Sequence, residues 1–195
     1  MAYDDEDLTY FGSVGVGGKA GASDQSSVSH TYLDDGTYTV TVRVLDGDDI
    51  VTDTLVVTVG NVDPTITSLT GDSSVGEGAL ANFQASATTP GTDTLTYTWN
   101  FNDLSDDSVG AGVSHAFADE GIYTVTLTVT DEGVGETTAE YIVSVFNTAP
   151  IITGASGAPT AQEGPGGSAD FSGSASDAGD DTLAYTWNFG DGSAP

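Results

Sequence analysis

Apolar and polar side chains alternate along several short stretches of this chain. Between residues 123 and 129, one tyrosine, two valines and one leucine alternate with three threonines. Residues 38–44 have the same alternation. Because successive side chains of a strand point to opposite faces of a sheet, this period of two predicts strands with one face in a core and the other in water.

Further runs of the same kind predict strands at Thr54–Val59, Ala81–Ala87, Leu95–Phe101 and Thr138–Val145. The dipeptide Asp46-Gly47 lies between two apolar alternations, which is typical of a hairpin turn. No stretch carries an apolar stripe of helical period. Short strands separated by turns rich in Gly and Asp predict an all-β fold, a series of tandem immunoglobulin-like antiparallel β-sandwiches.

The chain contains internal repeats, which set its expected domain organisation. The segment that begins at His30 recurs from His115. The segment Thr94–Ser105 recurs from Thr182.

Two linkers of the form Asn-x-x-Pro, at Asn61 and Asn147, mark the boundaries of these repeats. Residues 1–63 are predicted to be the rear part of a repeat, 64–147 a complete repeat, and 148–195 the front part of another. A partial repeat cannot close a sandwich by itself, so each is expected to expose strand edges and an apolar face.

Two recurring aromatic positions sharpen this prediction. Tyr38 and Tyr123 each begin a strand after an Asp/Gly corner, which is typical of a tyrosine corner, where the phenol hydroxyl bonds the backbone of the preceding loop. Trp99 and Trp187 lie in the middle of predicted strands, and the alternation points both rings into a core. Stacking of these tryptophans on a carbohydrate is the functional alternative.

Tyr185–Ser193 and Gly121–Val129 together resemble the polycystic kidney disease (PKD) repeat, whose signature is a W-D-F-G-D-G-S strand end followed by a Y-x-V-x-L-x-V strand. The likeness runs from about residue 28 to the last residue. Trp99–Ser105 lacks both signature glycines, so we expect an altered turn there. Leu8–Tyr10 leads into Phe11 without a tryptophan. The resemblance implies non-catalytic spacers, adhesion modules or accessory domains of secreted hydrolases.

The charge of the chain excludes several classes of partner. Lys and Arg number 2 against 30 Asp and Glu, which gives a formal net charge of −28. With only Lys19 and Arg43 to neutralise phosphate, nucleic acid and anionic membrane surfaces are excluded. Bound divalent cations, high external salt or an elongated arrangement would compensate the self-repulsion of the acids.

The inventory of reactive residues is equally narrow. Cysteine is absent, so disulfides and thiolate metal sites are excluded. His30 and His115 occupy the same repeat position and are interpreted as framework residues. No G-x-S-x-G motif occurs, and we expect no enzyme activity. No apolar run is long enough to span a membrane, and no signal segment follows Met1, so a secretion signal would lie outside this sequence or export would be unconventional.

Calcium is the cofactor that the acidic residues favour, because Ca²⁺ takes six to eight oxygen ligands. Three elements recur: the linker Asn, a Glu-Gly turn after the first strand, and the loop before the Trp strand. In related tandem surface repeats this grouping resembles a calcium clamp at a domain junction. The candidate ligands are Asn147, Glu163, Asp177, Asp180 and Asp181, and in the earlier copy Asn61, Asp63, Glu77 and Asp93.

The alternative is a set of solvated turn acids. The loop before the first Trp keeps one acid where the later loop has three, so the Asn147 junction is expected to bind calcium more tightly than the Asn61 junction. The Gly190–Gly192 turn is expected to be conformational and not to bind metal.

The predicted function is therefore a structural and adhesive rod, stalk or fibre outside the cell or on its surface. The expected partner is another copy of the chain, joined head to tail by strand addition, which propagates into a filament; a polysaccharide or another surface protein is the alternative partner. The alternative to such assembly is that the chain is a fragment of a longer repeat protein. The alternative function is an accessory binding or spacer module of a secreted protease or polysaccharide-degrading enzyme.

Overall fold

The computed structural model describes residues 9–14, 21–23, 27–46, 48–132, 135–157, 160–161, 164 and 167–192. By contacts the chain divides into two compact units, which are Met1–Thr65 with Ala87–Thr96 and Val129–Thr137, and Ile66–Ser86 with Tyr97–Thr128 and Thr138–Pro195. Every regular element among the described residues is a strand. The all-β prediction is therefore confirmed.

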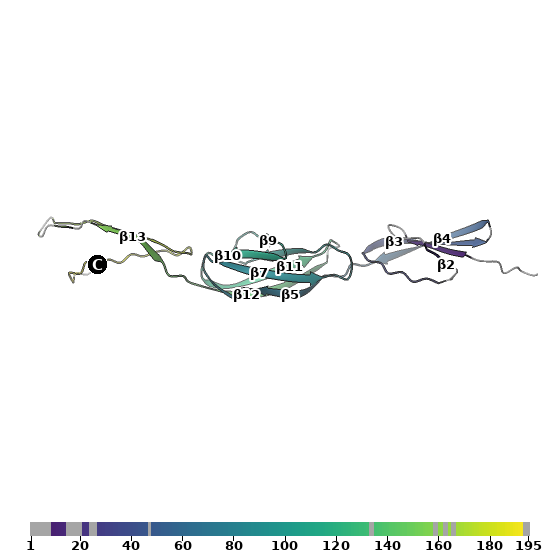
Figure 1. The fold of residues 1–195 in the computed structure, drawn as a ribbon, viewed down its shortest axis with the longest axis horizontal. Helices are drawn as coiled ribbons and strands as arrows, with labels where there is room; N and C mark the ends of the chain where they lie inside the picture. The colour runs from purple at the N-terminus through teal and green to yellow at the C-terminus, as the bar shows by residue number, and fades with distance from the viewer. Residues whose placement is uncertain are drawn as a thin grey trace, which may run out of the picture. The chain divides into compact units, whose positions relative to one another are not determined.

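The central repeat is a two-sheet sandwich (Figure 1). One sheet has the order β10-β7-β5 and consists of β5 (Thr65–Gly71), β7 (Leu80–Thr88) and β10 (Gly112–Ala116). The other has the order β6-β12-β11-β8-β9 and consists of β6 (Ser74–Gly76), β8 (Thr96–Asn100), β9 (Ser108–Val109), β11 (Gly121–Thr130) and β12 (Glu136–Phe146). The short strand β6 runs parallel to β12, with Val75 beside Val145.

The core of the central repeat lies between these sheets. Its buried apolar residues are Ala81, Phe83, Ala85, Trp99, Phe101, Phe117, Val125, Leu127, Val129, Val143 and Val145. Along β7 and β11 they alternate with more exposed residues, as the period of two predicts. Trp99 is fully buried and donates its indole N–H to the carbonyl of Gly110 over 2.8 Å. A buried indole needs such a partner, so Trp99 is a core residue.

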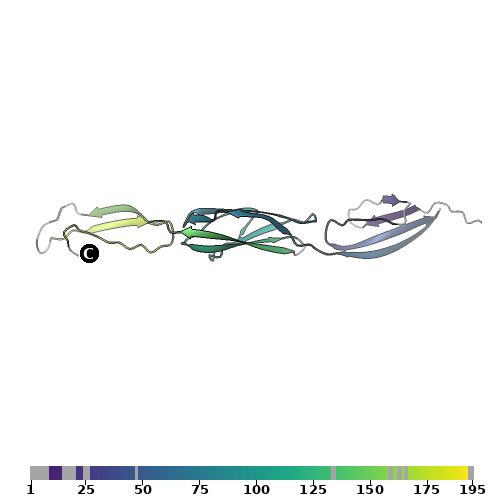
Figure 2. The same cartoon turned by 90° about the horizontal axis from the view of Figure 1, so that it is seen from below.

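The described residues before the first linker contain one sheet, the N-terminal sheet, with the order β2-β1-β3-β4. Its strands are β1 (Thr9–Val14), β2 (Gly21–Ser23), β3 (Gly36–Asp46) and β4 (Asp49–Val59). The two long strands lie side by side in Figure 2, and Asp46 is opposite Asp49. The predicted hairpin is confirmed, although its Gly47 lies outside the described residues.

The described part of the C-terminal segment contains one antiparallel pair, β13 (Ile151–Gly157) and β14 (Phe171–Ser176). Residues 181–189 form no strand, and Trp187 is only half-buried. The prediction that Trp187 lies in mid-strand within a core is therefore wrong for this chain. In the central repeat the strand of Trp99 lies beside β11, and the described part of the C-terminal segment supplies no such neighbour.

Both predicted tyrosine corners are confirmed. The Tyr38 hydroxyl donates to the carbonyl of Asp34, and the Tyr123 hydroxyl donates to that of Asp119, each over 2.9 Å. Burial, and then the nearby charge of Asp119, raises the pKa of Tyr123 above its usual value. The phenol therefore keeps the proton that it donates.

The turn after Trp99 has the conformation of its glycine-containing counterpart. Asn102 and Leu104 have φ of 57° and 70°, and Gly190 and Gly192 have φ of 76° and 80°. The expectation of an altered turn is therefore wrong. The reason is local, because in each turn an Asn side chain two residues upstream accepts the backbone N–H of the first of these residues, over 3.0 Å in one copy and 2.9 Å in the other.

Candidate metal centre at the second linker

The parallel pairing of β6 with β12 fixes the position of Glu77. The N–H of Glu77 donates to the carbonyl of Phe146 over 3.0 Å, which continues the ladder one residue beyond β6. Its side chain therefore lies beside the linker that follows β12. The carboxylate oxygen Oε1 accepts the backbone N–H of Thr148 over 2.6 Å, and the residue is only 1% exposed. The other oxygen, Oε2, is buried without a hydrogen-bond partner.

The loop at residues 177–181 brings two more carboxylates to Glu77. Both carboxylate oxygens of Asp177 are buried and lack hydrogen-bond partners. Asp181 accepts the side-chain amide of Asn147 over 3.1 Å. The loop is anchored by the N–H of Asp180, which donates to the carbonyl of Ala118 over 3.0 Å.

Gly179 allows this close approach. A Cβ atom on Gly179 would lie 2.7 Å from Glu77 Oε2 and 2.8 Å from the carbonyl oxygen of Ala118. Neither distance is tolerable for a methyl group, so the loop can pack against Glu77 only because residue 179 has no side chain.

The resulting cluster is the acidic pocket of Glu77, Asp177 and Asp181, whose nearest oxygens all lie within 4.8 Å of one another. Glu77 belongs also to a second group, with Asp119 and Glu120 of the tyrosine-corner loop. Like charges at this separation repel strongly where water is excluded. Such oxygens suit a hard divalent cation, which would supply the missing partners of Glu77 and Asp177.

The first linker is built in a similar way but with less burial. The N–H of Thr92 donates to the carbonyl of Leu33 over 3.1 Å, matching the bond between Asp180 and Ala118. Asp34, Asp93 and Glu132 form an acidic group there, but none of the three is buried. The Asn61 amide binds Asp131 over 3.0 Å and so does not repeat the pairing of Asn147 with Asp181.

The predicted ligands are therefore only partly brought together. Repeat order groups Glu77 with Asn61 and Asp93, whereas the structure groups it with the loop of the following repeat. The side chains that meet at the second linker are Asn147, Glu77, Asp177 and Asp181, while Asp63 and Asp180 are exposed and belong to none of the acidic groups found in the described residues, and Glu163 lies outside those residues.

Sequence reasoning missed four acids that join these groups, namely Asp34, Asp119, Glu120 and Glu132. Asp34 and Asp119 each lie four residues before the tyrosine of a tyrosine corner. Their shared position in both repeats was the one signal that could have identified them as possible ligands.

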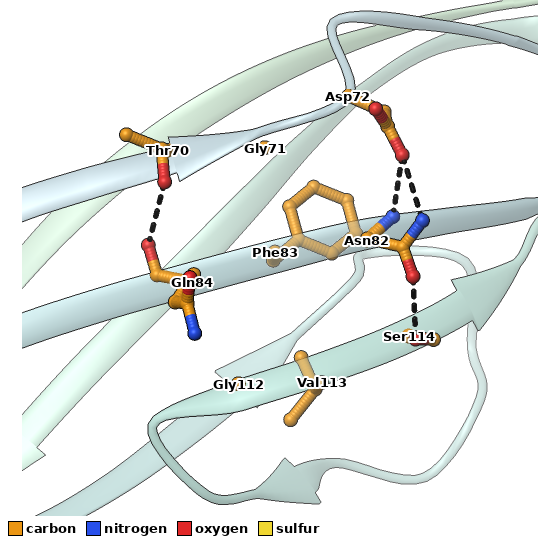
Figure 3. A pocket seen from close by; sticks show the side chains of 9 residues that line it. All are labelled: Thr70, Gly71, Asp72, Asn82, Phe83, Gln84, Gly112, Val113 and Ser114. Carbon is orange, nitrogen blue, oxygen red and sulfur yellow. Dashed lines mark hydrogen bonds between the residues drawn. The ribbon is translucent and has the colours of Figure 1, made fainter.

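The described residues contain two other polar features. An open groove along β10-β7-β5 is lined by both polar and apolar residues, and several of the polar ones bond one another (Figure 3). Asn82 donates both its backbone N–H and its amide to Asp72, which lowers the pKa of that acid, and accepts the hydroxyl of Ser114 over 2.8 Å. The side chains of Asp72, Asn82 and Ser114 are thus already paired with one another.

The second feature is the His115–Asp103 pair, joined over 2.5 Å, with the imidazole stacked on Phe101. Burial opposes ionisation of Asp103, but hydrogen bonds from Ser105 and His115 outweigh it, so the pKa of Asp103 lies below its usual value. His115 is thus a framework residue, as predicted.

A two-sheet sandwich with a tyrosine corner and a buried tryptophan on the strand beside it defines an immunoglobulin-like module. Comparison with protein families identifies which family of such modules this chain belongs to. PKD domain models match residues 2–59, 61–145 and 147–195, and the chain belongs to the PKD domain family.

The matches therefore show PKD domains in tandem, and modules of this family are typically non-catalytic and extracellular. A search of curated proteins gave no match. None of the described segments forms a helix with the length and hydrophobicity that a membrane span requires.

Proposed function

We propose that this chain is a non-catalytic part of an extracellular or cell-surface rod, stalk or fibre used in adhesion, and that calcium binds at its second linker and stiffens it. The family supports the structural role. Copies joined end to end would extend the rod into a fibre. The observation that carries the calcium proposal is Glu77, a carboxylate that is 1% exposed with one oxygen unpartnered.

The energetics favour a bound cation. An unpartnered buried polar group costs roughly 1–3 kcal/mol, and more when it is charged. The acidic pocket holds such oxygens on two residues, Glu77 and Asp177, beside the third carboxylate of Asp181. The attraction of a divalent cation for all three carboxylates offsets their mutual repulsion. The cation would also give the unpartnered oxygens a partner.

Calcium suits the pocket better than magnesium. Ca²⁺ accepts irregular sets of six to eight oxygens, whereas Mg²⁺ requires near-ideal octahedral geometry and keeps most of its water. The three carboxylates come from a turn after β6 and from a loop of the next repeat, so they form an irregular set. Water and backbone carbonyls would complete the coordination shell.

The test is thermal unfolding in millimolar calcium against chelator, at matched ionic strength in sodium chloride so that general charge screening is constant. A ligand that binds only the folded state at about 100 times its dissociation constant adds about 2.7 kcal/mol to stability. We expect a higher melting temperature in calcium, and a smaller increase in magnesium. Identical melting in calcium and chelator would contradict the proposal.

A pair of matched variants locates the ion. Asp181→Asn removes one charge from the acidic pocket and should abolish most of the calcium effect. Asp180→Asn removes one charge from the adjacent residue, which is exposed and outside the pocket, and should leave the effect intact. A loss of similar size in both variants would assign the effect to net charge.

A further inference from the structure

One face of the N-terminal sheet is apolar, and the described residues leave part of it exposed. In β3, Tyr38, Val40, Val42 and Val44 occupy one face by their alternation, and Val42 is 43% exposed. In register with them on β4, Leu55 lies opposite Val40 and is exposed. The described residues place no second sheet against this face.

The described part of the C-terminal segment lacks the other half of a sandwich, a strand pair like β11-β12. Its pair β13-β14 corresponds to β5-β7, since the Phe171 ring lies against Gly157 as the Phe83 ring lies against Gly71. Phe83 is 2% exposed in the closed sandwich, whereas Phe171 is 48% exposed.

The aromatic cluster of the C-terminal segment is nevertheless arranged as in the closed sandwich. Phe83 lies 5.8 Å from Trp99 at 40° between ring planes, and Phe171 lies 6.0 Å from Trp187 at 41°. Phe83 lies 5.8 Å from Phe101 at 44°, and Phe171 lies 5.7 Å from Phe189 at 46°. The cluster thus has the arrangement found in the central repeat, where a strand pair of the β11-β12 type covers it.

We propose that a second copy of this chain supplies that strand pair, so that the β3-β4 face of one molecule closes over the β13-β14 face of the next. This deepens the proposed fibre role and rests on it. The two surfaces are the two different halves of one PKD sandwich, so the contact is heterologous. A heterologous contact propagates into a chain of molecules unless its rotation closes a ring.

Two features limit the strength of this contact. Asp53 lies opposite Val42 and therefore on the apolar face, at the position that Ala139 occupies in β12 of the central repeat. Burial of this carboxylate opposes docking. In addition, β1 already pairs with β3, so residues 181–189 could gain a strand partner only by displacing it. The proposal needs only the face-to-face packing of the two sheets.

The test is analytical ultracentrifugation of the full chain over a range of concentrations, in several hundred millimolar salt to screen the acidic charge. The expected result is species at multiples of the 19.7 kDa monomer that increase with concentration. Val42→Asp should prevent association, whereas Thr41→Asp, on the opposite face of the same strand, should permit it. Phe171→Asp should prevent association from the other end, with Ser172→Asp as its control.

Mixing the two blocked variants distinguishes a head-to-tail contact from any other. Phe171→Asp retains an intact N-terminal face and Val42→Asp an intact C-terminal face, so their mixture should form a one-to-one dimer and nothing larger. Phe189→Ser provides a second C-terminal block should Phe171→Asp disorder that segment. Asp53→Ala should strengthen association at least several-fold.

A chain that stays monomeric at every concentration would overturn the proposal, as would association that survives both blocks. In that case the occupant of the exposed face would be another segment of a longer polypeptide or a different protein. Calcium-dependent melting is measured on monomer at low concentration, so a failure of self-association leaves the result for the acidic pocket unaffected, and the reverse also holds.

Discussion

The strands β3 and β11 have nearly the same sequence pattern, yet they differ in burial. Val125, Leu127 and Val129 of β11 are completely buried, whereas Val42, the counterpart of Leu127, is 43% exposed. Both strands are regular, and each lies beside a strand of 11 residues, β4 or β12. The pattern therefore determines which face is apolar, and the opposing sheet determines whether that face leaves water.

This difference has energetic consequences. Full burial of a Val or Leu side chain contributes about 1.5–3 kcal/mol, which β11 gains and β3 gains only in part. Local interactions such as the tyrosine corner are the same in both copies. The comparison thus predicts that substitutions acting through burial will differ between complete and partial repeats, and that substitutions acting through local bonds will not.

The largest expected difference concerns the two tryptophans. Trp99→Ala should destabilise the central repeat by about 3–5 kcal/mol, because it empties a fully buried site. Trp187→Ala should cost clearly less, because that ring is half-buried. Urea unfolding followed by far-ultraviolet circular dichroism and by hydrogen exchange of β11 amides measures the first loss.

The chain has 2 tryptophans, which provides an internal control. In Trp187→Ala the remaining fluorescence comes from Trp99 and reports the central repeat, whose unfolding midpoint should not change. Equal losses for the two variants would mean that the C-terminal segment already possesses a closed core.

The sequence predicts the local features of this structure better than those that depend on contacts between distant segments. The strands with clear alternation, the hairpin at Asp46 and both tyrosine corners are encoded by residues close together in the chain. The strand β6 is only three residues long and pairs in parallel with β12, so no local pattern identifies it. Yet β6 positions Glu77.

The sequence predicts an acidic site at this linker, but it does not predict which acidic residues come together there. Glu77 and Asp177 are far apart in sequence and meet only because Gly78 and Gly179 let two loops approach each other. The prediction that Trp187 is buried is wrong for a related reason, since its burial depends on a sheet that the described C-terminal segment does not contain. Contacts between distant segments are the part that pattern reasoning cannot supply.

A smaller effect tests whether substitutions that act through local hydrogen bonds have the same effect in both repeats. Tyr38→Phe and Tyr123→Phe each remove one hydrogen bond to a loop carbonyl, which typically contributes about 0.5–1.5 kcal/mol. Because the bond lies within one turn, we expect similar losses in both copies. Hydrogen exchange of β3 and β11 amides measures each loss separately, and a much larger effect at Tyr123 would show that the corner depends on the opposing sheet.

The smallest expected effect is a gain in stability at Leu104. This residue adopts a φ of 70° with a fully exposed side chain, at the position where the C-terminal turn has Gly192. The left-handed region costs a residue with a Cβ about 1–2 kcal/mol, and the greater freedom of glycine in the unfolded chain offsets about 0.5–1 kcal/mol of that. Leu104→Gly should therefore stabilise the central repeat by up to about 1 kcal/mol, since no packing is lost.

Leu104→Ala is the matched control, because it removes the exposed side chain but keeps the Cβ, and it should give no gain. The urea midpoint of the central repeat, followed by Trp99 fluorescence in a Trp187→Phe background, measures both changes. An equal gain in the alanine variant would attribute the effect to the exposed leucine side chain, and the backbone of this turn would then carry no strain.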